Sequence, residues 1–97
     1  MPAYVIVDID VMDPDGYEAY KKAVPANLER YGGEYLCRGG ETEVLEGEWV
    51  PKRLVMLQFE SMDQARRWYN SADYQALCEV RKRTAHSRML LVEGATP

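Results

Sequence analysis

The 97-residue chain is 46% apolar and 29% charged, a composition that is typical of a single globular domain with a modest core and that excludes a disordered chain. Its net charge of −4 argues against a nucleic-acid partner, since phosphate backbones are bound by faces rich in Lys and Arg. No apolar run approaches the roughly 18 residues of a membrane span, and the N-terminus lacks a signal-peptide core, so we expect a cytoplasmic protein that makes no membrane contact.

The first half of the chain predicts a strand followed by a helix. Residues 3–11 alternate between apolar positions such as Val5 and Val7 and positions such as Asp8, the period-two pattern of a strand. Asp13 followed by Pro14 predicts the start of a helix, because Asp accepts free amide hydrogens and Pro has the φ of a first helical turn. The helix is expected to run to Tyr31 and to stop at the glycine pair that follows.

The second half predicts a hairpin, a helix in two pieces and a last strand. Residues 34–46, interrupted at Gly39-Gly40, and residues 53–60 are expected to form a long hairpin. Ser61 to Gln64 matches a capping box, and Ser71 recaps a second helical piece. Residues 87–93 then form the last strand.

The resulting order is β-α-β-β-α-β over residues 1–97, which predicts one α+β domain of the ferredoxin-like plan. In that plan a four-stranded antiparallel sheet carries both helices on one face. Strand residues on both faces are apolar, for example Leu57 and Met56, so the face without helices needs a cover. The simplest cover is a second copy of the chain, sheet against sheet, in a two-fold homodimer.

Several motifs along almost the whole chain together resemble one family. They are Ala3 to Val7, Tyr31-Gly32-Gly33, Leu45-Glu46-Gly47 with Trp49, Pro51 and Arg53, Phe59, Tyr69-Asn70-Ser71, Tyr74, Arg81 and Ser87. The chain resembles the domain-of-unknown-function family thirteen-thirty, in the dimeric α/β-barrel superfamily. The resemblance implies a ferredoxin-like protomer, a barrel-forming dimer and a pocket between sheet and helices. Related families range from cofactor-free oxygenases, isomerases and cyclases to haem-handling and stress-induced proteins, so the resemblance implies no single chemistry.

A group of aromatic and arginine side chains is the main candidate for a ligand site. A guanidinium and phenol hydroxyls that converge in an apolar cleft would suit a small carboxylate or aromatic ligand, although the same residue types also serve in cores and interfaces. For Arg53, which opens a strand, either an internal acid such as Glu46 or an incoming anion would have to compensate the buried charge. The candidates are Tyr20, Trp49, Arg53, Tyr69, Tyr74 and Arg81.

Two alternatives concern proton transfer. His86, the only histidine and not part of the family pattern, is a candidate general acid or base, and Asp8 or Asp10 on the neighbouring strand is a candidate to orient it; the alternative is a solvated residue at a helix-to-strand junction. Pro2 would be an N-terminal base if Met1 were removed, as in tautomerases, but the rest of the chain does not show their pattern.

No metal or cofactor is expected, because the chain has no glycine-rich phosphate loop, flavin fingerprint or metal-ligand spacing, and Cys37 and Cys78 lie far apart. The leading hypothesis is a homodimeric small-molecule-binding domain, with a cofactor-free enzyme of the oxygenase, isomerase or cyclase type as its stronger form. The alternatives are a non-enzymatic stress-related or scaffold dimer and a tautomerase that uses Pro2.

Overall fold

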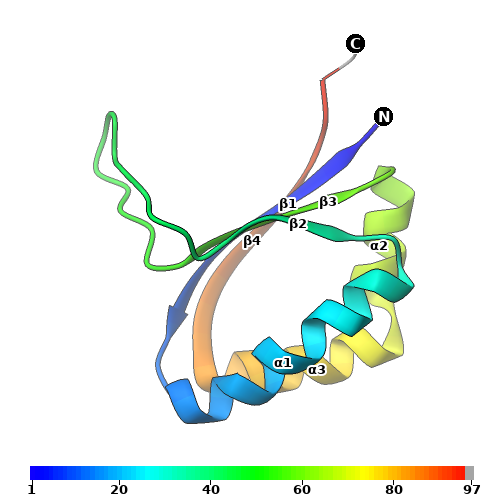
Figure 1. The fold of residues 1–97 in the computed structure, drawn as a ribbon, viewed down its shortest axis with the longest axis horizontal. Coiled ribbons are helices and arrows are strands. Elements are labelled where there is room, and N and C mark those ends of the chain that lie inside the picture. Colours follow the sequence, from blue (N-terminus) through cyan, green and yellow to red (C-terminus); the bar gives the residue numbers. More distant parts are fainter. Residues whose placement is uncertain (96–97) are drawn as a thin grey trace.

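A four-stranded antiparallel sheet and three helices on one of its faces make up the fold (Figure 1). The computed structural model describes residues 1–95. The strand order β2-β3-β1-β4 confirms the predicted α+β, ferredoxin-like architecture, with the second predicted helix divided in two. The elements are β1 (Ala3–Val11), α1 (Pro14–Arg30), β2 (Glu34–Arg38), β3 (Leu54–Phe59), α2 (Met62–Asn70), α3 (Ala72–Thr84) and β4 (Ala85–Glu93).

Polar caps define where the helices begin. The Asp13 carboxylate accepts a hydrogen bond from the Gly16 amide at 3.2 Å, which confirms the predicted start of α1. Ser71 ends α2 and its hydroxyl oxygen accepts from the Tyr74 amide at 3.2 Å, so the predicted break between the two helical pieces is also confirmed. Within residues 1–95, no helix combines the length and the apolar character that crossing a bilayer requires.

The core lies between the sheet and the helices. Alternation along β1 directs Val5, Val7 and Ile9 toward the helices, where they are buried. The helices contribute large aromatic residues, among them Trp68 of α2, whose indole Nε1 donates to the Asn27 Oδ1 of α1 at 2.8 Å. This bond satisfies both buried polar groups, so the indole holds α2 against α1 without an unpaired donor.

The opposite face of the sheet, here called the outer face, has no helix on it. Ile6 of β1 lies in register with Met56 of β3 on one side and Leu90 of β4 on the other. These side chains form an apolar row across three strands, and Leu90 is 61% exposed. Both faces of the sheet are therefore apolar, as the sequence predicts, and only one of them is covered within the protomer.

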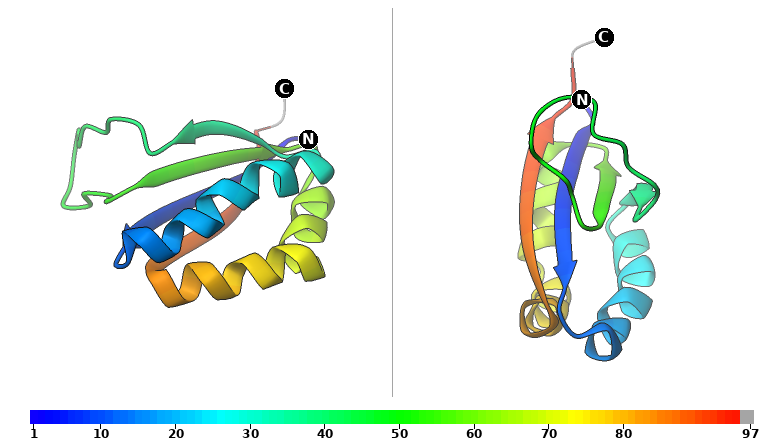
Figure 2. Two further views of the ribbon diagram at one scale, coloured as in Figure 1. Left: turned by 60° about the horizontal axis from the view of Figure 1, so that its bottom comes forward. Right: turned by 90° about the vertical axis from the view of Figure 1, so that its left-hand side faces the viewer.

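The predicted antiparallel pairing of the second and third strands is confirmed, but the predicted length of the hairpin is wrong, because β2 ends at Arg38 and residues 39–53 form no strand. Gly39 has a φ of 70°, a left-handed conformation that turns the chain away from the ladder. The returning limb is held by Asp8, whose carboxylate accepts from the Trp49 indole at 2.9 Å and from the Lys52 amide at 3.0 Å. Residues 40–52, called the arm below, therefore project beyond the sheet on the side away from the helices (Figure 1, Figure 2).

Candidate functional site

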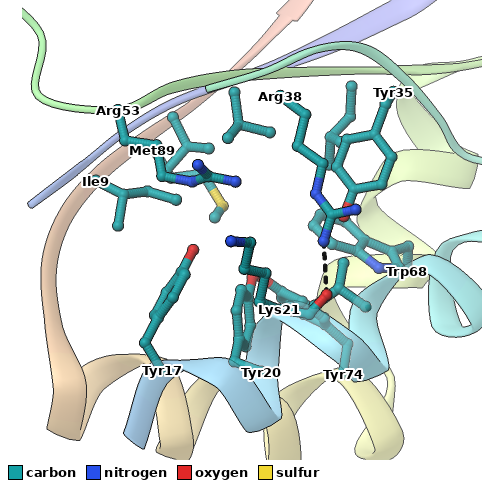
Figure 3. Close-up of a pocket in the computed structure, with 14 residues that line it drawn as sticks. Ile9, Tyr17, Tyr20, Lys21, Tyr35, Arg38, Arg53, Trp68, Tyr74 and Met89 are labelled. Atoms are coloured by element: carbon teal, nitrogen blue, oxygen red, sulfur yellow. Dashed lines mark hydrogen bonds between the residues drawn. The ribbon is translucent and has the colours of Figure 1, made fainter. Parts of the chain in front are cut away.

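A small pocket lies between α1 and the inner face of the sheet, with side chains from both meeting in it (Figure 3). Its sheet side combines apolar side chains with Tyr35, Arg38 and Arg53, and its α1 side carries phenol rings and one amine. The cavity measures about 30 Å3, which is room for about one water molecule. A larger ligand must therefore displace side chains. The lining residues are Val7, Ile9, Tyr17, Tyr20, Lys21, Val24, Tyr35, Arg38, Arg53, Val55, Leu57, Trp68, Tyr74 and Met89.

Three cationic side chains border this pocket, and none of its lining residues is acidic. The Arg38 guanidinium donates to the Lys21 carbonyl oxygen at 2.6 Å, and the Lys21 ammonium lies 3.8 Å from Glu18 on the same helix. Arg53 differs from both, because its Nε is buried and has no hydrogen-bond partner within residues 1–95. Of the two alternatives for Arg53, the internal pair with Glu46 is not formed, and Glu46 lies exposed on the arm.

The backbone at Gly39 determines where the Arg53 guanidinium lies. A Cβ at Gly39 would stand 2.8 Å from the Arg53 Cζ and closer still to one of its terminal nitrogens. Because real Cβ atoms do not approach other heavy atoms so closely, the Arg53 side chain occupies space that exists only because residue 39 is glycine. Gly39, which directly follows β2, thus leaves the space that the Arg53 guanidinium occupies.

The phenols on the helix side are kept protonated by burial. The Tyr20 and Tyr74 hydroxyl groups share a hydrogen bond of 2.8 Å, which joins α1 to α3. Burial raises the pKa of Tyr20 to about 12 and raises the pKa of Tyr74 as well. Burial also raises the pKa of Tyr17, although the positive charge of Arg53 opposes the shift. At neutral pH these side chains are hydrogen-bond donors and not bases.

Arg81 lies behind the tyrosine pair and does not line the pocket. It is 4% exposed, and its guanidinium carbon lies 6.0 Å from the centre of the Tyr20 ring. Its terminal nitrogens donate to the Ser87 hydroxyl and, at 3.5 Å, to the Cys78 sulfur, while its Nε has no partner within residues 1–95. It therefore adds positive charge behind the site without contacting the cavity.

Of the six candidate ligand residues, Trp49 and Tyr69 lie elsewhere. Trp49 is on the arm and bonds Asp8 on the outer face, so the sheet separates it from the pocket. Tyr69 of α2 lines two grooves beside β4 and not the pocket. The pocket thus brings together Tyr20, Arg53 and Tyr74 from the predicted set.

The proton-transfer candidates also lie outside the pocket. His86 is exposed on the outer face opposite Asp10, in register at the start of β4. The Asp8 carboxylate is occupied by Trp49, Lys52 and Arg88, and these bonds, the indole bond above all, lower its pKa. Pro2 lies directly before β1 and does not line the pocket. The pocket is lined instead by Val7 and Ile9, in the other half of that strand.

Comparison with known families assigns the chain. A family described as a domain of unknown function (DUF1330) matches residues 2–95. The chain belongs to the DUF1330 family. The family resemblance predicted from the sequence motifs is therefore confirmed. A separate comparison found no curated protein sequence that matches the chain.

Solved structures similar to this DUF1330 chain share its fold. RPA0582 of Rhodopseudomonas palustris, a protein of unknown function, is 16% identical with a TM-score of 0.77, over 99% of this chain and 84% of that one. SnoaB, a cofactor-independent oxygenase from Streptomyces nogalater, is 13% identical with a TM-score of 0.66, over 99% and 95%. A putative antibiotic biosynthesis monooxygenase from Nitrosomonas europaea is 16% identical with a TM-score of 0.60, over 99% and 100%.

Four polar residues line the DUF1330 pocket although the sequence does not predict them as ligand residues: Tyr17, Lys21, Tyr35 and Arg38. Tyr17 and Lys21 are four residues apart on α1, so their shared helix face is a signal that the sequence does contain. Arg38 carries no such signal, because its position depends on where β2 ends. Taken together, the pocket presents cations and neutral phenols toward a common centre, an arrangement that suits a bound anion.

Proposed function

We propose that this DUF1330 protein is a homodimer that binds a small aromatic or carboxylic anion in the pocket between α1 and the sheet. The observation that carries the proposal is the buried Nε of Arg53, unpartnered within residues 1–95 in a pocket lined by no acid. A guanidinium is costly to desolvate without a counter-charge, and an incoming carboxylate would supply it together with acceptors for the free N–H groups.

The small cavity is compatible with this proposal because the residues that close it are long and flexible. Lys21 and Arg38 reach over the pocket from α1 and β2, and both extend to the protein surface. If they swing outward, a ring-sized ligand gains room between the phenols and the apolar sheet wall. The walls would then provide the apolar contact, and Arg53 the orientation, that small-ligand sites combine.

The stronger form of the proposal is a cofactor-free enzyme of the oxygenase, isomerase or cyclase type. It is supported by the fold that the chain shares with SnoaB, whose own description is that of a cofactor-independent oxygenase. The competing hypothesis, a stress-related or scaffold dimer, requires the pocket to stay filled by its own side chains. The tautomerase hypothesis would need Pro2 at the site, and Pro2 lies outside the pocket lining.

The homodimer is supported by the uncovered outer face. Its apolar row includes Ile6, Met56 and Leu90, with Leu36 of β2 and Val92 of β4 exposed nearby. A second copy placed sheet against sheet with two-fold symmetry would remove this surface from water. We therefore propose that the working form of the protein is a pair of protomers.

A thermal-shift screen against a panel of aromatic and aliphatic carboxylates tests the ligand proposal. At a hundredfold excess over the dissociation constant, a binding acid should stabilise the wild type by about 2.7 kcal/mol. In a domain of this size that corresponds to a rise in melting temperature of roughly 10–20 °C. Arg53→Met should abolish the rise, whereas Arg67→Met, which alters an exposed arginine of α2 outside the pocket, should keep it.

The apo proteins provide a second readout in the same screen. Removing an unpaired buried donor should not destabilise the fold, so Arg53→Met without ligand should melt at or above the wild-type temperature. If no acid stabilises the wild type, or if Arg53→Met responds as the wild type does, the proposed site is wrong.

A further inference from the structure

The arm, residues 40–52, carries large apolar side chains that remain exposed to solvent in the protomer. Leu45 at its tip is 87% exposed, Val50 is 67% exposed, and the Trp49 indole is 53% exposed although its Nε1 is bonded to Asp8. Large apolar residues that cluster on a projecting segment are costly in water, and such clusters mark interaction surfaces. Figure 2 shows that the segment reaches past the end of the sheet, where it is free to contact another molecule.

The charge of the arm identifies the kind of surface that it fits. Four glutamates and one lysine give it a net charge of −3, out of −4 for the whole chain. The complementary charge lies on this same protein, where Lys82 and Arg83 at the end of α3 are exposed. An acidic arm and a basic surface on one chain are self-complementary, which is the condition for a two-fold contact between identical copies.

A groove between the arm and the outer face provides the place for that contact. It measures about 580 Å3 and is lined by Ile6, Asp8, Trp49, Val50, Arg88 and Leu90, among others. The groove thus joins the apolar row of the sheet to the apolar side of the arm. A partner that covers the outer face would also enter this groove.

We propose that in the homodimer each arm closes over the partner copy, with Leu45, Trp49 and Val50 buried against it and the arm's glutamates directed to the basic end of α3 at Lys82 and Arg83. This inference rests on the proposed homodimer and goes beyond it, because outer faces can pair without any contribution from the arms. It makes residues 40–52, which form no strand with their own protomer, an element of quaternary structure.

Acrylamide quenching of tryptophan fluorescence tests the arm directly. Trp68 is 1% exposed, so quenching reports mainly on Trp49, and a Trp49→Phe variant measures the remainder to be subtracted. Along a dilution series, light scattering gives the oligomeric state of the same samples. We expect the quenching constant of Trp49 to be at least about twofold lower in the dimer than in the monomer, because interface cores exclude solvent.

A pair of substitutions adds an independent readout. Leu45→Asp should raise the dimer dissociation constant at least about tenfold, while leaving the circular dichroism of the protomer unchanged, since Leu45 is solvent-exposed in the protomer. Ala26→Asp, which changes an exposed apolar residue on α1, away from the arm and from the outer face, should dimerise as the wild type does.

The outcomes separate the two proposals. A dimer in which Trp49 stays as quenchable as in the monomer, or in which Leu45→Asp pairs as tightly as the wild type, overturns the role of the arm and leaves the homodimer standing. A protein that is monomeric at every concentration overturns both. Protection of Trp49, together with weaker dimerisation of Leu45→Asp but not of Ala26→Asp, supports the proposed role of the arm.

Discussion

Replacing Gly39 by alanine should damage the protein in two ways that can be measured separately. The first is backbone strain, since a φ of 70° costs a residue with a Cβ about 1–2 kcal/mol. The second is a collision, because the new Cβ would lie 2.8 Å from the Arg53 Cζ; this is the far end of a flexible side chain, so moving it aside should cost at most about 1 kcal/mol. The sum of about 1–3 kcal/mol predicts a fall in melting temperature of roughly 5–20 °C.

Two other glycines of the chain provide matched controls. Gly47 also has a positive φ, 87°, but a Cβ there would meet nothing within 4 Å, so Gly47→Ala measures strain alone. Gly40 has neither a positive φ nor a neighbour within 4 Å, so Gly40→Ala should be close to neutral. Unfolding followed by circular dichroism should therefore rank the losses in the order Gly39, Gly47, Gly40.

The decisive comparison uses the Arg53→Met background. If the excess cost of Gly39→Ala over Gly47→Ala arises from displacement of the guanidinium, it should disappear when the guanidinium is absent, as a double-mutant cycle measures. An excess that persists in that background, or losses that are equal at Gly39 and Gly47, would show that Gly39 does not position Arg53.

Three further predictions concern the outer face, Asp8 and the buried phenols. Leu90→Asp places a charge in the exposed apolar row and should yield a folded monomer by light scattering; a dimer as tight as the wild type would move the interface elsewhere. Trp49, with the Lys52 amide and Arg88, holds the pKa of Asp8 below its ordinary 3.8. The contribution of ionised Asp8 to the stability of the fold is therefore complete above pH 3.8 and is lost as pH falls through the lower folded-state pKa. The stability difference between wild type and Asp8→Asn should accordingly shrink in acid, and a pH-independent difference would contradict the assignment. Tyr20 keeps its proton up to about pH 12 in the fold but loses it above about 10 when unfolded, so its contribution is complete below pH 10 and is lost as pH rises toward 12. Tyr20→Phe should lose less stability across that window than the wild type, and parallel losses would count against a buried phenol.

The elements whose side chains contact near neighbours in sequence were predictable. Alternation along residues 3–11 predicts which side chains of β1 face the helices, because a strand has only two faces. Asp13 and Ser71 predict helix boundaries since each cap bonds an amide three residues away. These signals depend on local geometry, which the sequence order alone determines.

The arm was not predictable from the same kind of signal. Residues 41–49 contain Thr, Val and Trp, which favour a strand, yet a strand also needs a neighbour with which to pair. The contact that decides the path is the bond from Trp49 to Asp8, which spans 41 positions in sequence. For the same reason Trp49, expected in the pocket, lies on the other side of the sheet. Tyr20 lies on α1 and Arg53 directly precedes β3, so both are found in the pocket as expected.

The chemistry available in the pocket limits what reaction it could support. Its polar lining consists of cations and phenols whose pKa values are raised by burial, and none of the lining residues is an acid or a histidine. Such a set donates hydrogen bonds and stabilises negative charge, but it offers no side chain that would accept a proton at neutral pH. A substrate that reacts there must therefore arrive ionised or carry its own base. Any acceleration of the reaction must come from stabilising the negative charge that develops beside Arg53. Without such a substrate the pocket would be a binding site only. The ionisation state of the acids that stabilise the protein therefore distinguishes an enzyme from a binding domain. It does so more directly than mutation of His86, which lies outside the pocket lining.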